Sequence, residues 1–377
     1  MPEITKIPKM PYSYLIKKDG DYTIAYDKYG NEKYSRTDAS TVIQEAIDAL
    51  SVDGTIFIEG GAWGSEMQLT NTIDIGSAHN GVAGRGLKII IDGTIYINHG
   101  NEAFRFWGTK FVKFCAQVIR VKANYPNAVF RFDDCVSNRI DVGYIYFPTP
   151  YNASSKAAYL YSEHASVFGY VGWNEIKIHE ILGSKIAIHA YSDAHNYQVH
   201  SNKIEFGWLN FAEASTTAIK MYNKGVGNKI YGGVIHLDSS LASQIGIDTS
   251  DSDLHVFGVD IRAGNATDLA YQNSGRLFLH GCSFPISKTS NAATVVFDDC
   301  FDNEVYKLFK NSGTATILNT GVSVTFAHGL ARTPTLVTLG ATHAEVADAV
   351  WSADATNITI TVPSAVTANR NISWYVE

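Results

Sequence analysis

One short pattern decides the fold of this chain. An asparagine, a charged residue and a β-branched residue occur together as Asn138-Arg139-Ile140, Asn174-Glu175-Ile176, Asn202-Lys203-Ile204, Asn228-Lys229-Ile230 and Asn303-Glu304-Val305. With Asp253 taken as a further member, the first steps along this series are 36, 28, 26 and 25 residues. A period of this length indicates a structure built from stacked coils. The tetrapeptide Phe-Asp-Asp-Cys recurs at 132–135 and 297–300, three residues before an asparagine in both cases.

Short strands flank the asparagine of each coil. A triplet with an apolar middle residue follows six or seven residues later, and these middle residues are Ile145, Ile181, Leu209, Ile235, Ile261 and Phe284. One coil cannot bury its own apolar residues, but coils stacked about 4.8 Å apart bury a continuous column of them. We therefore predict an all-β fold, a right-handed parallel β-helix. The asparagines are expected in the left-handed conformation, each bonding the next in a ladder.

The two ends of the chain have sequence patterns that differ from that of the coils. Helix-capping residues at 37–40 and apolar residues at helical spacing predict a helix over 38–51, which would cover the open N-terminal edge of the β-helix. From residue 311, alternating strands and polar turns predict a small C-terminal antiparallel β-sandwich. The expected divisions are a leader with strands at 1–36, the β-helix at 37–310, and the sandwich module at 311–377.

Composition excludes several classes of protein. The 377 residues carry a net charge of −7 without a clustered basic surface, which argues against a nucleic-acid partner. Four cysteines without CxxC or zinc-ligand spacing predict buried free thiols. No stretch has the length and apolarity of a signal peptide or a membrane span, so no membrane association is expected. An extracellular or virion-associated protein is the interpretation that we favour.

The chain resembles the pectate-lyase-like superfamily, which includes pectate lyases, polygalacturonases and phage tailspikes. The resemblance spans about residues 22–310 and is carried by three features: the helical segment from Thr37 to Asp48, the strand 54–58 after it, and the asparagine-marked coils. It implies that the strand after the asparagine turn forms a groove for sugar chains. The catalytic motifs of polygalacturonases are missing from this sequence, so no catalytic residue is carried over from the family.

The outward positions of the second triplet predict the side chains of that groove. Aromatic rings stack on sugars and polar groups bond them, which makes Tyr144, Tyr146, Trp208 and Asn210 candidate substrate-binding residues. Ionisable groups can exchange protons, and the candidate catalytic residues are Glu180, Glu213, His236, Asp238, Asp260 and Arg262. The competing interpretation is a partly covered aromatic stripe with solvated charges.

Two chemistries are open at this groove. Hydrolysis of a glycosidic bond needs two carboxylates roughly 5–9.5 Å apart, for which Glu180 with Glu213, or Asp238 with Asp260, are the candidate pairs. β-Elimination needs a base and a group that neutralises a uronate, for which His236 and Arg262 would serve. No cofactor is expected, apart from calcium if the protein is a lyase.

The predicted function is cleavage of an extracellular polysaccharide, with glycoside hydrolase slightly favoured over polysaccharide lyase. The alternative is a non-catalytic adhesin or a tail-fibre or tailspike component that binds glycans. A homotrimer is the expected assembly, with the C-terminal module as the trimer-forming part.

Overall fold

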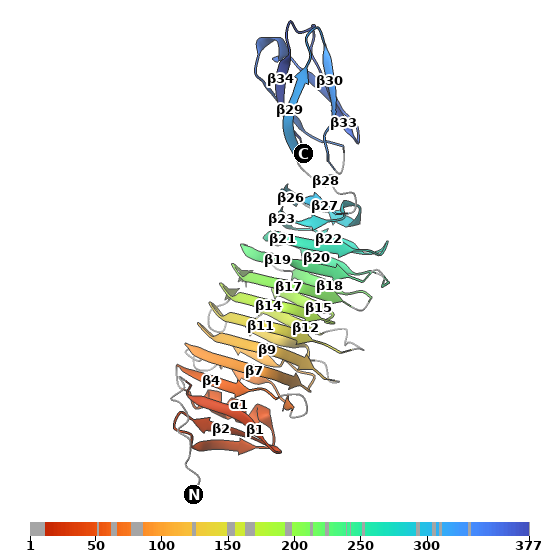
Figure 1. Ribbon diagram of the computed structural model, residues 1–377. Helices are drawn as coiled ribbons and strands as arrows, with labels where there is room; N and C mark the ends of the chain where they lie inside the picture. The colour runs from red at the N-terminus through yellow and green to blue at the C-terminus, as the bar shows by residue number, and fades with distance from the viewer. Residues whose placement is uncertain are drawn as a thin grey trace, which may run out of the picture.

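The protein is elongated, with coils stacked along one axis and a separate module beyond the last coil (Figure 1). The computed structural model describes residues 12–50, 53–61, 66–76, 86–122, 126–148, 155–162, 170–192, 198–211, 214–222, 226–238, 240–241, 243–250, 253–291, 295–303, 307–308, 311–330 and 333–376. Strands dominate, and the parallel pairing of successive coils confirms the predicted right-handed parallel β-helix.

Two parallel sheets form the body of the β-helix. The first sheet contains β4 (Gly54–Glu59), β5 (Met67–Leu69), β7 (Leu87–Ile97), β9 (Lys113–Val121), β11 (Arg139–Tyr146), β14 (Glu175–Leu182), β17 (Lys203–Phe211), β19 (Asn228–Leu237), β21 (Asp253–Ala263), β23 (Arg276–His280), β24 (Ser283–Phe284), β26 (Val295–Asp298) and β27 (Phe301–Asp302), with β28 (Lys307–Leu308) antiparallel to β27. The second sheet contains β6 (Ile73–Ile75), β8 (Phe104–Trp107), β10 (Ala128–Asp133), β12 (Lys156–Ser162), β15 (Ile186–Ser192), β18 (Thr217–Tyr222), β20 (Ile245–Ser250), β22 (Leu269–Asn273) and β25 (Thr289–Asn291). A short pair, β13 (Tyr170–Gly172) and β16 (Gln198–His200), and the 3₁₀ turn η1 (Ile286–Lys288) complete the described coils.

The long strands of the first sheet bend halfway along. In β11 the buried residues change phase, from Ile140 and Val142 to Ile145, and the pairing with β14 skips the intervening Gly143. A side chain could not be added at the equivalent Gly207, because a Cβ there would lie 2.6 Å from the carbonyl oxygen of His179. The bend divides the first sheet into two faces. We call the outward face of the second halves the groove face.

The predicted ladder exists over four asparagines. Asn138, Asn174, Asn202 and Asn228 are buried, and each of the first three donates from its backbone and side-chain nitrogens to Oδ1 of the next, at 3.0–3.1 Å. In this arrangement the buried side-chain amides are hydrogen-bonded from one coil to the next, as buried polar groups in proteins usually are.

Three details of the predicted ladder are wrong. The left-handed residue is the one before each asparagine, as at Ser137 and Ser201, because the asparagine side chain must point inward to reach its neighbour. The register pairs Asn228 with Leu254, so Asp253 is one residue out of the ladder and bonds Arg276 instead. Asn303 lies after β27, on the groove side of the last coil, and bonds Asp260.

The predicted inward column is confirmed. Pairing places Ile145, Ile181, Leu209, Ile235 and Ile261 in one row, each at most 1% exposed. Phe284, in the next coil, is fully buried as well. Burying one large apolar side chain stabilises the folded state by about 1.5–3 kcal/mol, so a column of six is a main source of stability.

The N-terminal end is closed by two devices. Strand β1 (Tyr14–Asp19) pairs with β4 and, through a hairpin, with β2 (Tyr22–Asp27), which pairs with β3 (Glu32–Arg36), so that the first sheet continues into an antiparallel end. Helix α1 (Ala39–Asp48), capped by Asp38, covers the edge of the second sheet. Its Gln44 side chain bonds both the amide and the carbonyl of Asp74 in β6. The predicted capping helix is thus confirmed, and it protects one sheet edge rather than the whole end.

The C-terminal module is the predicted antiparallel sandwich. One sheet contains β29 (Asn311–Ile317), β34 (Arg370–Val376) and β31 (Val337–Ala341), and the other contains β30 (Ser323–Ala327), β33 (Asn357–Thr361) and β32 (Val350–Ala353). The 3₁₀ turn η2 (Ala344–Val346) precedes β32. The expected boundary near residue 310 falls at positions outside the described residues.

Candidate functional site

Two rows of side chains run along the groove face. Strand pairing orders the first row as Val118, Tyr144, Glu180, Trp208, Val234, Asp260 and Ser283. The second row is Arg120, Tyr146, Leu182, Asn210, His236 and Arg262. This is the register that the sequence predicts, so Glu180, His236 and Asp260 do lie on one face.

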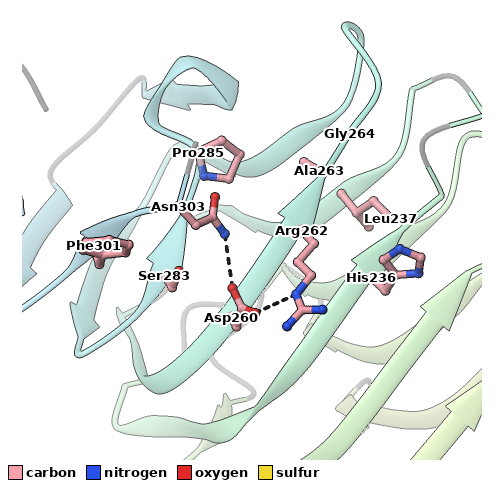
Figure 2. Close-up of a pocket in the computed structure, with 10 residues that line it drawn as sticks. All are labelled: His236, Leu237, Asp260, Arg262, Ala263, Gly264, Ser283, Pro285, Phe301 and Asn303. Carbon is pink, nitrogen blue, oxygen red and sulfur yellow. Dashed lines mark hydrogen bonds and ion pairs between the residues drawn. The ribbon is translucent and has the colours of Figure 1, made fainter. Parts of the chain in front are cut away.

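The C-terminal end of this face contains a hollow of about 580 Å³. Its described lining residues are His236, Leu237, Asp260, Arg262, Ala263, Gly264, Ser283, Pro285, Phe301 and Asn303. They come from β19, β21 and the start of the next two coils, and Figure 2 shows His236, Asp260 and Arg262 grouped at one side of it. Three of the predicted catalytic side chains are therefore brought together in one hollow.

Asp260 is held from two directions. Arg262 Nε donates to its Oδ2 at 2.7 Å, and Asn303 Nδ2 donates to its Oδ1 at 3.1 Å and to the carbonyl of Ile261 at 3.0 Å (Figure 2). Arg262 uses only Nε for Asp260, and its two Nη groups make no hydrogen bond with the described residues. Those groups can bind an anion in the hollow, in the forked geometry that suits a carboxylate.

His236 is oriented by the row beside it. Its Nδ1 lies 3.4 Å from Oδ1 of Asn210, and its ring lies 6.0 Å from that of Trp208, measured between centroids. Trp208 also lies under the Arg262 guanidinium, at 6.0 Å. Since Nδ1 faces Asn210, Nε2 is the nitrogen available for proton transfer to a ligand.

Two exposed tyrosines of the groove face lie several coils from the hollow. Tyr144 is 45% exposed and Tyr146 is 41% exposed, and the Arg120 guanidinium lies 5.6 Å from the Tyr146 ring centroid. The tyrosines and Arg120 form a second polar and aromatic patch on the same face, upstream of Trp208. A long chain-like ligand could contact both places, whereas a small one could not.

Two other predicted catalytic residues, Glu180 and Asp238, are not among the described residues that line the hollow. Glu180 lies three coils from Asp260 in the same row, about 14 Å away by the usual strand spacing, which is too far for a hydrolytic pair. Asp238 caps a turn, accepting from the amide and hydroxyl of Ser240 at 2.8 and 2.7 Å, and these bonds lower its pKa. Glu213 lies outside the described residues.

Sequence reasoning missed the contribution of the last coil. Asn303 bonds Asp260, and Phe301 and Pro285 line the hollow, yet Asn303 looked like a ladder asparagine. The pattern of an asparagine, a charged residue and a β-branched residue occurs both in the ladder and at residues 303–305, and only the strand pairing of β24 with β27 distinguishes the two places.

No group of three or more metal-ligating side chains is found within the described residues. In the acidic run at 248–253, Asp248 accepts a 2.5 Å hydrogen bond from Tyr222 and Asp253 pairs with Arg276, while residues 251–252 lie outside the described part. The part of the chain that the structure describes also contains no helix long and apolar enough to span a membrane.

No protein-family model matches this sequence, and no curated protein does. Among solved structures, a mutant tailspike protein of E. coli bacteriophage HK620 is 11% identical, with 90% of this chain and 89% of that chain covered and a TM-score of 0.30. The enzymatically active domain of tailspike protein 4 of bacteriophage CBA120 is 10% identical, with 96% and 66% covered and a TM-score of 0.31. Another HK620 tailspike mutant, in complex with a pentasaccharide, is 10% identical, with 90% and 89% covered and a TM-score of 0.20.

The right-handed parallel β-helix agrees with the fold that the resemblance to the pectate-lyase-like superfamily implies. At these identities and TM-scores, the similar structures assign neither an activity nor a residue role to this chain.

Proposed function

We propose that the protein binds a polysaccharide along the groove face and cleaves it at the hollow around His236, Asp260 and Arg262. The observation that supports this is the grouping in one hollow of a histidine, a carboxylate and an arginine whose Nη groups make no hydrogen bond with the described residues. The exposed Tyr144 and Tyr146 on the same face supply contacts for more distant sugar units.

The geometry favours β-elimination over hydrolysis. The sequence favoured hydrolysis because carboxylates outnumber bases along the groove. However, Asp260 is the single carboxylate among the described lining residues, and it already bonds Arg262 and Asn303. A hydrolase needs a second carboxylate within 5–9.5 Å. The neighbouring His236 and Arg262 supply a base and an anion-binding group, which suit elimination from a uronate.

Each side chain then has one role. Arg262 Nη groups bind the uronate carboxylate, and Asp260 and Trp208 hold the guanidinium in place. His236 Nε2 takes the proton on the carbon next to that carboxylate, the electron pair forms a carbon–carbon double bond, and the bond to the leaving glycosidic oxygen breaks. Water protonates the leaving oxygen, so the products are one reducing end and one unsaturated uronate. A calcium requirement remains a prediction for this reaction, since lyases often neutralise the uronate with that ion.

The test is a panel of uronate-containing and neutral polysaccharides, assayed for reducing ends and for the absorbance of unsaturated uronates. Elimination raises both signals together. Reducing ends without the absorbance would overturn elimination in favour of hydrolysis. Glycan binding with neither product would overturn the enzyme proposal and support a non-catalytic adhesin, the function that the two-sided hydrogen bonding of Asp260 would also fit.

We further propose that the protein acts at a particle or cell surface as a homotrimer. The support lies in the C-terminal module, where large apolar side chains remain exposed on a single chain, among them Leu318 at 65%, Val350 at 64% and Trp351 at 41%. Exposed apolar groups of this kind are typical of association surfaces. Light scattering of the intact protein at several concentrations tests the trimer; a monomer mass throughout would overturn it.

A further inference from the structure

The outward face of the second sheet carries an aromatic array that the hollow does not use. Strand pairing aligns one column as Arg131, Tyr159, His189, Lys220 and Asp248, and a neighbouring column as Asp133, Tyr161, Tyr191, Tyr222 and Ser250. We call the central six residues the tyrosine platform: Tyr159, Tyr161, His189, Tyr191, Lys220 and Tyr222.

The rings of the platform hold one another in position. Tyr159 and His189 stack at 5.0 Å between centroids, Tyr161 and Tyr191 at 5.8 Å, and Tyr159 lies 5.1 Å from Tyr161. Tyr191 is 37% exposed and the other platform residues are half-buried. Rings locked by packing present their hydroxyl groups at fixed places, which reduces the entropy lost when a ligand binds. Successive coils place the rings of one column about 4.8 Å apart along the helix axis.

The acidic groups at the two ends of the platform are bonded to other residues, and lysines lie beside its rings. Arg131 bonds Glu102 at 2.9 Å and Asp133 at 2.7 Å, so the acidic groups at this end are already neutralised. At the other end Asp248 accepts the hydroxyl hydrogen of Tyr222. Lys220 lies 4.4 Å from the Tyr222 ring centroid and forms no ion pair with any described carboxylate, and Lys156 lies 4.9 Å from the Tyr159 ring centroid.

The two lysines affect the protonation of a neighbouring histidine. Burial and then the charges of Lys156 and Lys220 lower the pKa of His189 to about 3, so this ring is neutral at ordinary pH. The centre of the platform therefore combines aromatic rings, tyrosine hydroxyls and the positive charge of Lys220. Sugar rings with carboxylate groups are complementary to that combination, because they offer hydroxyls, apolar C–H faces and negative charge.

We propose that the tyrosine platform is a second polysaccharide-binding site, specific for a carboxylate-bearing chain that lies along the helix axis. It belongs to strands β12, β15 and β18 of the second sheet, whereas the hollow belongs to the first sheet. The platform binds without cleaving, and it holds a long polymer to the protein independently of the chemistry at the hollow.

The experiment measures the dissociation constant of the intact protein for polygalacturonate, with dextran as the neutral probe, by affinity electrophoresis or calorimetry. The test variant is Tyr191→Ala with Lys220→Ala, and Lys220→Gln serves as a second, milder variant. The matched control is Lys28→Ala with Tyr29→Ala, because Lys28 lies 5.1 Å from the Tyr29 ring centroid in the N-terminal hairpin, far along the chain from the platform. Thermal unfolding checks that all variants fold.

We expect the platform variants to weaken polygalacturonate binding by about tenfold, which corresponds to about 1.4 kcal/mol. The control should bind as the native protein does, and added salt should weaken native binding. Unchanged affinity in both platform variants, or equally tight binding of dextran, would overturn the proposal. The result is separate from the proposed cleavage: a protein without any lyase activity can still show platform binding, and an active lyase can lack it.

Discussion

The coils that carry the asparagine ladder and the coils beyond it contribute strands to the same two sheets, yet they differ at one buried position. From Asn138 to Asn228 that position is an asparagine bonded to the next, whereas it is leucine at Leu254 and again at Leu277. The hollow with His236, Asp260 and Arg262 opens where the ladder ends. The regular ladder thus stabilises the scaffold, and the candidate site lies at the end of the ladder, where the side chains no longer repeat from coil to coil.

If the hollow is catalytic, its side chains should affect activity far more than an exposed side chain on a coil in the middle of the ladder. His236→Ala removes the proposed base, and we expect the rate of formation of unsaturated uronate to fall about a thousandfold, in the range typical of general acid–base groups. The matched control is His179→Ala, an exposed histidine on β14 in the ladder coils. Equal activity of the His236 variant and the native protein would remove this residue from the mechanism.

Conversely, the ladder asparagines should contribute more to the stability of the fold than the side chains of the hollow do. Asn202→Ala removes an acceptor for Asn174 and a donor to Asn228 in the interior, and we expect a loss of about 3 kcal/mol in the free energy of unfolding. Urea denaturation measures it. Asn303→Ala is the control with the same sequence marker outside the ladder, and its expected loss is about 1 kcal/mol. Similar losses in both variants would mean that the ladder contributes nothing special.

Acid should weaken the ladder coils through His189. Its folded-state pKa is lowered to about 3, mainly by burial, while the unfolded chain takes up the proton near pH 6.5. The stability is therefore fully present above pH 6.5 and is lost progressively as the pH falls toward 3. Between pH 7 and 4.5, His189→Phe should lose about 2 kcal/mol less than the native protein. A parallel pH dependence of the two proteins would show that this ring does not control acid stability; His179→Phe is the surface control.

The smallest effect is expected at the aromatic patch on the groove face. Tyr146→Ala should raise KM for a long polysaccharide about fivefold with kcat unchanged, because the ring contributes binding that is the same in the ground and transition states. Short oligosaccharides that reach only the hollow should show no change. Tyr29→Ala, 76% exposed in the N-terminal hairpin, controls for loss of a surface tyrosine. A fall in kcat would instead place Tyr146 in the chemistry.

Features that depend on periodicity could be predicted from the sequence. The inward column from Ile145 to Ile261 and the outward rows with Glu180 and His236 follow from alternation within short strands, since a one-residue slip would turn every side chain over. The four ladder asparagines followed from the same phase.

The sequence could not predict features that depend on the corner of the coil at which a segment lies. Phe-Asp-Asp-Cys forms a left-handed turn in both copies, with φ of 49° at Asp134 and 50° at Asp299. However, the first copy ends β10 of the second sheet and the second ends β26 of the first sheet. Identical local turns can close different corners, and only pairing across coils decides between them. The partnership of Asn303 with Asp260 was hidden for the same reason.

The asparagine ladder also has a mechanical consequence. Its hydrogen bonds join one coil to the next, so they lie along the direction in which the molecule would be stretched if its two ends were pulled apart. Such a tensile load would be shared between the backbone pairing and this central column as far as Asn228. Beyond it, the coils around the hollow lack the column, and we expect the first rupture under tension there.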